Sequence, residues 1–174
     1  PSLPSATRGS IDSRFPHPGA RHLSADARGH SIGTIPTPSL VLDAARVRAN
    51  VARVADYARS HGIAVRPHTK THKSVAVAGL QLASGAVGLT VAKVGEAEAL
   101  VRAFGDREPD ILVAYPAVDP ARTVRLAALA RLGRIGVAVD TVPAIEALSA
   151  AASAAGTTLG ILVDLDVDLG VLLG

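Results

Sequence analysis

From Pro38 onward, short apolar runs alternate with longer segments in which apolar residues recur every three or four positions. Short apolar runs between turn residues are typical of buried strands, and the longer periodic segments are typical of amphipathic helices. Within 44–61, for example, Val47, Val51 and Val54 recur at helical spacing, and Gly62 follows at the usual stop position. The strands are expected at 39–43, 63–68, 87–92, 110–115, 135–140 and 159–167. The helices are expected at 44–61, 73–84, 95–104, 120–132 and 142–155.

Strands separated by single helices predict an α/β fold with a parallel sheet and right-handed crossovers. The pattern fits either a closed, TIM-type (β/α)8 barrel or an open doubly wound sheet. A complete barrel takes ~250 residues, so we expect this chain to hold only about the first six βα units of a barrel in a larger protein. An open α/β domain, complete as it stands, is the alternative.

The first 34 residues differ from the rest of the chain. They are rich in Ser, Arg, His, Gly and Pro and show no apolar periodicity. This composition predicts a flexible leader at 1–34, followed by the incomplete barrel at 35–174. A targeting peptide is the alternative for the leader, although the apolar region of a secretory signal is absent.

Composition narrows the classes of function. The chain is 48% hydrophobic and 19% charged, which is a globular composition. Only 2% of the residues are aromatic and the net charge is +3, so we expect no nucleic-acid partner. No apolar run approaches the ~20 residues needed to cross a bilayer, so no membrane partner is expected. Cysteine is absent, which excludes disulfides and thiolate metal sites and is compatible with a cytoplasmic location.

The densest chemistry lies where the second predicted strand ends in a cluster of basic side chains. Lys70 and Lys73 are two of the three lysines in the chain, and they are interleaved with Arg66, His68 and His72. Ligands of parallel α/β folds gather at the carboxyl ends of strands. Like-charge repulsion there would lower the pKa of Lys70 and favour the neutral amine, which can form an imine with an aldehyde. The same positive field attracts phosphate, and pyridoxal 5′-phosphate (PLP) carries both groups.

Two other interpretations of this cluster remain open. A solvated basic turn that binds nothing in particular is about equally compatible with the residues. The spacing of His68 and His72 also admits a metal site, but no carboxylate lies beside them and the turn would have to be helical.

The segment Arg-Pro-His-Thr-Lys-Thr-His-Lys at 66–73 resembles the Arg-Pro-His-x-Lys-Thr-His-Lys segment of the D-threonine aldolase and D-serine dehydratase family. These are PLP enzymes of fold type III, with an alanine racemase-like N-terminal barrel and a C-terminal β domain. Other stretches fit the family in the same order, namely 37–43 with Asn50, 81–87, 90–98 and 110–114. The resemblance covers residues 36–167.

The resemblance implies roles for individual residues. Lys70 would be the Schiff-base lysine and, in turnover, a base at the substrate Cα. Arg66 and His68 would line the cofactor. Lys93 and Glu96 also match the family motif, but we expect a structural role for them where the strand meets the helix.

The sequence departs from the family after the sixth predicted strand. Related enzymes usually run Asp-x-Gly-x-x-Arg-x-Gly there, whereas Asp168 occupies the Gly position and Val171 the Arg position. The contact of that arginine is therefore missing. The phosphate-binding loops and the ligands of a divalent metal are expected beyond Gly174, so we expect the 174-residue chain to be inactive alone.

The family resemblance implies a PLP-dependent lyase that acts on a small D-β-hydroxy amino acid, as an aldolase or a dehydratase, and is a homodimer at full length. A PLP-binding barrel without catalysis and an amino-acid racemase of the same fold are the alternatives. A basic anion-binding module is a third possibility, and the lack of interleaved aromatic residues argues against it.

Overall fold

The computed structural model describes residues 37–39, 41–104 and 109–165. The chain divides into two units, of which one ends at Val41 and the other runs from Leu42 to Gly174. Within the first unit, residues 37–39 and Val41 are described, and Pro38 follows a cis peptide bond. Every helix and strand of the described residues belongs to the second unit.

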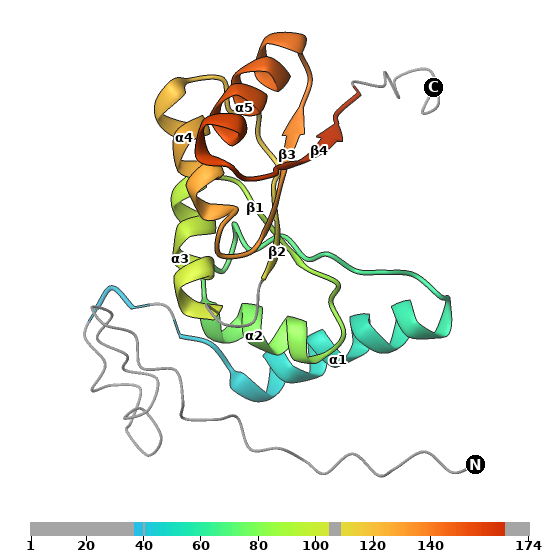
Figure 1. Cartoon of the computed structure of the whole chain (residues 1–174). Helices are drawn as coiled ribbons and strands as arrows, with labels where there is room; N and C mark the ends of the chain where they lie inside the picture. Colours follow the sequence, from blue (N-terminus) through green and yellow to red (C-terminus); the bar gives the residue numbers. More distant parts are fainter. Residues whose placement is uncertain (1–36, 40, 105–108, 166–174) are drawn as a thin grey trace, which may run out of the picture. The chain divides into compact units, whose positions relative to one another are not determined.

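The second unit alternates helices with parallel strands along the chain (Figure 1). In the described residues the helices are α1 (Ala44–Ser60), α2 (Val75–Ala83), α3 (Val94–Phe104), α4 (Pro120–Leu129) and α5 (Val142–Ala155). The strands are β1 (Leu89–Val91), β2 (Asp110–Val113), β3 (Arg134–Val139) and β4 (Gly160–Val163). They form one sheet in the order β1-β2-β3-β4, and each neighbouring pair is parallel. The predicted α/β class with a parallel sheet is confirmed.

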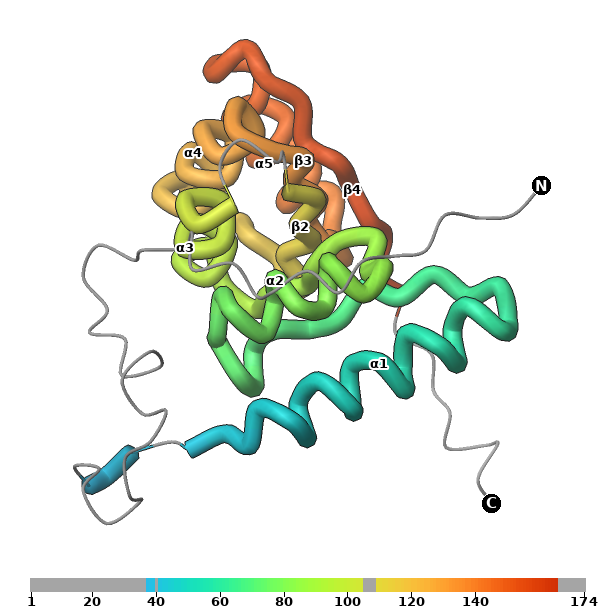
Figure 2. The backbone as a smooth tube through the Cα atoms, turned by 90° about the horizontal axis from the view of Figure 1, so that it is seen from below, coloured from blue at the N-terminus to red at the C-terminus, as the bar shows by residue number. Residues whose placement is uncertain are grey.

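The core lies between this sheet and α3, α4 and α5, which lie on the same side of it in both views (Figures 1 and 2). Alternate strand residues such as Leu89, Ile111 and Val137 are fully buried in this core, together with Leu126 of α4 and Leu148 of α5. Because successive side chains of a strand point to opposite faces, the intervening residues belong to the other face. The register aligns the following residues there in one row: His68, Thr90, Leu112, Gly136 and Gly160.

The first predicted strand, at 39–43, is wrong for its described residues. Residues 41–43 form no strand, and the side chains of Val41 and Leu42 are about half exposed. Asp43 instead begins α1, because its Oδ1 accepts hydrogen bonds from the backbone N–H groups of Ala45 and Arg46. A strand needs a neighbour for its backbone groups, and residues 41–43 have no ladder partner among the described residues. Residue 40 lies outside the described residues.

The second predicted strand, at 63–68, is extended but is not a regular strand. It pairs with β1 and the residues before it through backbone bonds from Val87 N–H to the Val65 carbonyl and from Thr90 N–H to the Pro67 carbonyl. Only His68 forms a recognised bridge, with Thr90. Pro67 has no N–H to donate, which interrupts the ladder on this segment. The last predicted strand, at 159–167, is shorter than expected, since β4 ends at Val163, and residues 166–167 lie outside the described residues.

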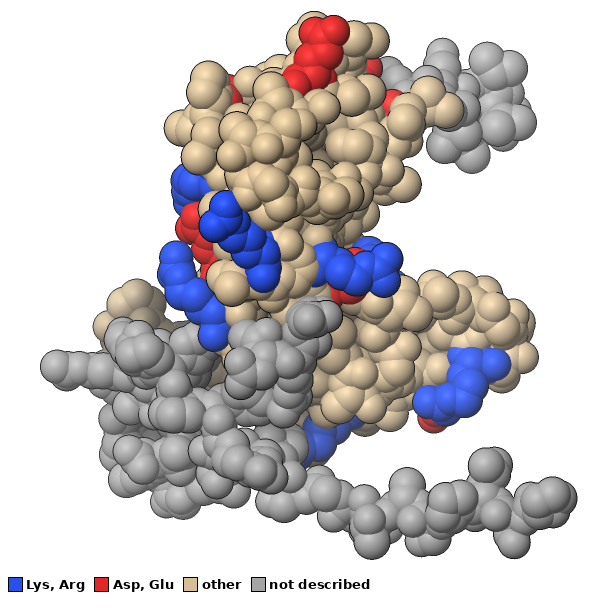
Figure 3. All heavy atoms as spheres, viewed as in Figure 1, with Lys and Arg blue, Asp and Glu red and all other residues tan. Residues whose placement is uncertain are grey.

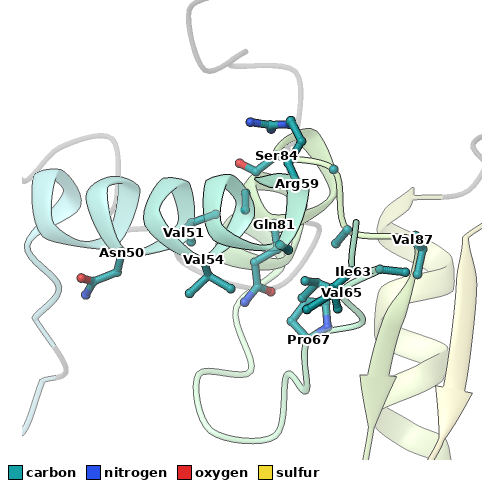
Figure 4. Close-up of a pocket in the computed structure, with 15 residues that line it drawn as sticks. Asn50, Val51, Val54, Arg59, Ile63, Val65, Pro67, Gln81, Ser84 and Val87 are labelled. Atoms are coloured by element: carbon teal, nitrogen blue, oxygen red, sulfur yellow. The ribbon is translucent and has the colours of Figure 1, made fainter. Parts of the chain in front are cut away.

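An apolar pocket of about 620 Å³ lies between α1, the extended segment 63–67 and the C-terminal end of α2 (Figure 4). Val51 and Val54 of α1 line it, together with Val65 and Pro67 of the extended segment. Because side chains alternate along an extended segment, Arg66 and His68 belong to the opposite face. The pocket therefore lies on the side of this segment away from the basic residues.

Charged side chains are dispersed on the face shown in Figure 3, where several basic residues lie beside acidic ones. Most described ion pairs join an arginine to a nearby carboxylate, as in Arg125 with Glu98 and Arg59 with Asp56. No helix in the described ranges is both long and apolar enough to cross a bilayer.

Candidate functional site

Lys70 lies on a turn that is fastened to the carboxyl end of β1. The N–H of Thr69 donates to the Thr90 carbonyl at 2.8 Å, and its hydroxyl donates to the same oxygen at 3.2 Å. The N–H of Lys73 donates to the Thr69 carbonyl at 2.8 Å, which closes the turn. Thr69 is buried, whereas Lys70 and Thr71 at the apex of the turn are exposed. The backbone of the turn is thus fixed, while the Lys70 side chain extends from its exposed apex.

Two histidines brace the turn on either side of Lys70. The N–H of Lys70 donates to Nδ1 of His68 at 3.2 Å, and the N–H of Ser74 donates to Nδ1 of His72 at 3.0 Å. A backbone N–H can only donate, so both Nδ1 atoms act as acceptors and each neutral ring carries its proton on Nε2. Each ring therefore constrains the backbone two residues after it, at Lys70 and at Ser74.

Both imidazoles are held in the neutral form. Burial lowers the pKa of His68, and the charge of Lys70 lowers it further, although Glu96 acts in the opposite direction. Burial also lowers the pKa of His72 and outweighs the opposing influence of the Gln81 side chain. His72 Nε2 and Gln81 Oε1 are both buried, but neither reaches hydrogen-bond geometry with a described partner.

Lys73 forms an ion pair with the first turn of α3. Its Nζ lies 3.0 Å from Oε1 of Glu96, and Oε2 of Glu96 accepts a hydrogen bond from the N–H of Ala92 at 2.9 Å. Lys73 has a positive φ of 45°, a conformation that is uncommon for residues other than glycine. Helix α2 accordingly starts after it, at Val75, where the Ser74 hydroxyl accepts a hydrogen bond from the Val77 N–H. The helix predicted to start at 73 therefore starts two residues later.

Arg66 is directed toward the amino-terminal end of the sheet. Its Nη1 donates to Oδ1 of Asp110 at 2.8 Å and to the Asp110 carbonyl at 3.2 Å, and Asp110 is the first residue of β2. The guanidinium passes over Gly88, where a Cβ atom would lie 2.0 Å from Nη1. Arg134 approaches the same carboxylate at 3.7 Å. Arg66 therefore contacts the end of the sheet opposite to Lys70, and its predicted place beside the cofactor stays a prediction.

The predicted basic cluster is thus divided into ion pairs and neutral rings. Arg66 is paired with Asp110, Lys73 is paired with Glu96, and the histidines are neutral. Lys70 forms no ion pair with any residue in the described ranges, and its charge acts on the neighbouring His68. The structure brings Lys70 and His68 together at the carboxyl end of the sheet.

Sequence reasoning did not anticipate the partners of the cluster. Asp110 is 44 positions from Arg66, and only the register of the sheet brings them together. The contact of Glu96 could be predicted from the sequence, because an acidic residue at the third position of a helix often accepts a hydrogen bond from an N–H just before the helix. Its contacts with Ala92 and Lys73 are of the structural kind expected at this junction. The described residues contain no group of three His, Cys, Asp or Glu side chains that could hold a metal ion.

The fold agrees with the comparison to known proteins. The profile of the alanine racemase N-terminal domain matches residues 42–173, and the chain belongs to this family. The chain is 44% identical over 138 residues to 3-hydroxy-D-aspartate aldolase of Paracoccus denitrificans. It is 39% identical over 142 residues to D-threonine aldolase of Arthrobacter sp., and 36% identical over 136 residues to D-threo-3-hydroxyaspartate dehydratase of Delftia sp..

A solved relative shares the three-dimensional fold. The crystal structure of D-threonine aldolase from Filomicrobium marinum superimposes with a TM-score of 0.72 at 39% identity, covering 76% of this chain and 35% of that one. The curated relatives are likewise longer, since the matches cover 78% of this chain but 35% of the Paracoccus enzyme, and 82% of this chain but 37% of the Arthrobacter enzyme. The chain therefore spans about a third of the length of these relatives.

Proposed function

We propose that this chain carries the cofactor-binding lysine of a PLP-dependent lyase that acts on D-β-hydroxy amino acids. The observation that carries the proposal is the amine of Lys70, which has no ion-pair partner among the described residues and extends from a fixed turn at the carboxyl end of the sheet. The names of the relatives, two aldolases and a dehydratase of D-configured hydroxy amino acids, support the reaction class. Because the chain spans about a third of those relatives, the activity is proposed for a protein of their full length.

The residues at this end of the sheet fit a carbonyl-bearing cofactor. Lys70 Nζ would hold the cofactor covalently through its aldehyde carbon, because an amine that is not engaged in an ion pair is free to react. His68 lies directly before the turn, and its Nε2–H is a hydrogen-bond donor once Nδ1 accepts from the Lys70 N–H. PLP, when bound, supplies an electron sink for the bond-breaking step at the substrate Cα.

The chain's own contribution to the chemistry is to position one amine and move one proton. The Lys70 amine would act as the base at the substrate Cα. The fixed turn would keep Nζ within a small region of the sheet edge, which is the main requirement for efficient proton transfer. The divalent metal that we propose for the full-length enzyme would polarise the β-hydroxyl, with ligands from outside the described residues.

Binding of PLP to the full-length protein tests the first part of the proposal. We expect an absorbance band of the lysine-bound cofactor when PLP is added, and we expect Lys70→Ala to lose it. Lys93→Ala is the matched control, because Lys93 is exposed and forms no ion pair with described residues. A wild-type protein without the band, or a Lys70→Ala variant that retains it, would refute the assignment.

Substrate assays separate the two lyase reactions. In the full-length protein, an aldolase releases an aldehyde and glycine from D-threonine, whereas a dehydratase releases ammonia and a 2-oxo acid from a D-β-hydroxy amino acid. We expect aldol cleavage, since the two most similar relatives named above are aldolases. Ammonia release without aldehyde would instead make the protein a dehydratase, and each assay is run with and without a divalent cation.

A further inference from the structure

The two lysines of the turn differ in their environment. Lys73 Nζ is 3.0 Å from a carboxylate oxygen of Glu96, whose side chain is only 16% exposed. Lys70 has no such partner among the described residues, although it is only three positions away. Both side chains are otherwise exposed lysines on the same turn. The difference between them therefore rests on Glu96.

Glu96 uses both of its carboxylate oxygens to connect the turn to the sheet. Oε1 accepts from Lys73, and Oε2 accepts from the backbone N–H of Ala92, directly after β1. Burial alone would raise the pKa of Glu96, but the hydrogen bonds from Lys73 and Ala92 outweigh burial and keep the pKa below its usual value. The carboxylate is therefore ionised at neutral pH and holds its two partners in fixed positions.

The backbone at Lys73 adopts an uncommon conformation beside this contact. Its φ of 45° lies in the left-handed region, which a lysine adopts only when surrounding contacts hold it there. The contacts that hold it are the bond from its N–H to the Thr69 carbonyl and the ion pair of its side chain with Glu96. Lys70 lies between Thr69 and Lys73, the two residues that the backbone hydrogen bond joins.

We propose that Glu96 is a positioning residue that selects Lys70 as the aldehyde-reactive lysine, by engaging the amine of Lys73 and by fixing the turn to the end of β1. An ammonium held by a carboxylate cannot attack a carbonyl carbon, so the neighbouring lysine does not compete. This inference rests on the proposed function, because it concerns the lysine that holds the cofactor.

The test measures which lysine reacts rather than how fast an enzyme turns over. The 174-residue chain is incubated with PLP and then treated with borohydride. A neutral Nζ attacks the aldehyde carbon, water is lost, and hydride reduces the resulting C=N bond to a stable secondary amine. Peptide mapping by mass spectrometry then gives the share of label at each of the three lysines, Lys70, Lys73 and Lys93.

We expect most of the label at Lys70 in the wild type. In Glu96→Gln, we expect the label at Lys73 relative to Lys70 to rise about two- to fivefold, the factor that corresponds to losing a partly exposed ion pair. Glu98→Gln is the matched control, since Glu98 is a similarly buried acid of α3 that pairs with Arg125 and with no lysine. Its labelling pattern is expected to equal that of the wild type.

Variants of Lys73 provide an independent measurement should Glu96→Gln unfold. Lys73→Arg can keep the ion pair with Glu96, whereas Lys73→Met cannot. We expect the labelling rate of Lys70 to stay at the wild-type value in the first variant and to fall in the second. Equal rates in the two variants would overturn the positioning role.

The outcomes distinguish the inference from the proposed function. Label at Lys70 with an unchanged share at Lys73 in Glu96→Gln overturns the inference and leaves the proposed function standing. A wild-type chain without label at Lys70 overturns both.

Discussion

Gly88 is a sensitive position of the sheet, because the guanidinium of Arg66 occupies the space that a side chain would need. In Gly88→Ala the new Cβ would lie 2.0 Å from Arg66 Nη1 and 2.6 Å from the Asp110 carbonyl oxygen. The first contact is with the end of a flexible side chain, which can move. The second is with the backbone of β2, which is held on both sides by the sheet. The substitution therefore displaces Arg66 and also strains the strand.

The magnitude follows from the contacts that are lost. Arg66 and Asp110 are 28% and 27% exposed, and two hydrogen bonds join them. Hydrogen bonds to charged groups are each worth about 1.5–3 kcal/mol, and overpacking a filled site costs about 1–3 kcal/mol. The two charges regain some hydration when they separate. We therefore expect Gly88→Ala to lower the free energy of unfolding by about 2–4 kcal/mol.

Urea denaturation followed by circular dichroism measures this change, with Gly79→Ala as the control. A Cβ at Gly79 would lie 3.6 Å from the ring of Phe104, which is ordinary contact, and Gly79 is inside α2. Replacing glycine by alanine inside a helix stabilises by about 0.5–1 kcal/mol. The two substitutions are chemically identical. A lower free energy of unfolding in Gly88→Ala and a higher one in Gly79→Ala would therefore isolate the effect of the occupied space above Gly88.

A double-mutant cycle gives the decisive result. In an Arg66→Ala background the contact with the guanidinium is gone, so the cost of Gly88→Ala should fall to that of the Asp110 contact alone. If the cost is the same with and without Arg66, within about 0.5 kcal/mol, Arg66 does not occupy this space and the reasoning is refuted.

Three further predictions concern stability. Burial lowers the pKa of His72 and of His68 in the folded protein. As the pH falls below ~6.5, the two imidazoles are therefore protonated in the unfolded chain before they are protonated in the folded one. The thermal denaturation midpoint should be constant above that pH and fall below it. In His72→Asn the midpoint should fall less steeply with decreasing pH. A midpoint of the wild type that does not change with pH would contradict this. Asp119→Ala should cost about 1 kcal/mol, because its carboxylate caps α4, and Thr141→Ala should cost less, because its side chain makes no capping hydrogen bond at α5. Equal urea midpoints for Asp119→Ala and Thr141→Ala would contradict a stabilising capping bond from Asp119. Ile111→Ala, at a fully buried position, should cost about 2–5 kcal/mol, and Ile111→Val about 0.5–1.5 kcal/mol. A cost for Ile111→Ala no larger than that for Ile111→Val would show that the site collapses around the cavity.

Sequence periodicity was sufficient for the elements that bury their side chains against one another. Strands β1 to β3 and helices α3 to α5 lie where their apolar patterns placed them, because local propensity and core packing favour the same conformation there. It was insufficient where a strand depends on a neighbour. Residues 41–43 are apolar enough for a strand, but no described segment pairs with them, and the capping preference of Asp43 determines their structure. Pro67 similarly interrupts a segment whose apolar pattern is that of a strand.

For the candidate site, the sequence indicated the position of Lys70 but not the charges around it. Composition alone suggested a group of like charges at 66–73. Arg66 and Lys73 instead find carboxylates on β2 and α3, at positions that only the assembled sheet determines. The neutral state of His68 and His72 follows from burial, and backbone N–H groups donate to both Nδ1 atoms; a charge count records neither.

The turn that bears Lys70 has a consequence for how the protein folds. Its anchors are close in sequence, since Thr69 and Thr90 are 21 positions apart and Glu96 lies in the helix that follows. Loops of this length close rapidly, and contacts of low sequence separation form early in folding. The contacts that fix the turn around Lys70 are therefore expected to form early relative to contacts between distant parts of the chain. Because β1 and α3, which follow the turn closely in sequence, supply its anchors, the position of Lys70 depends on two adjacent βα units rather than on distant parts of the chain.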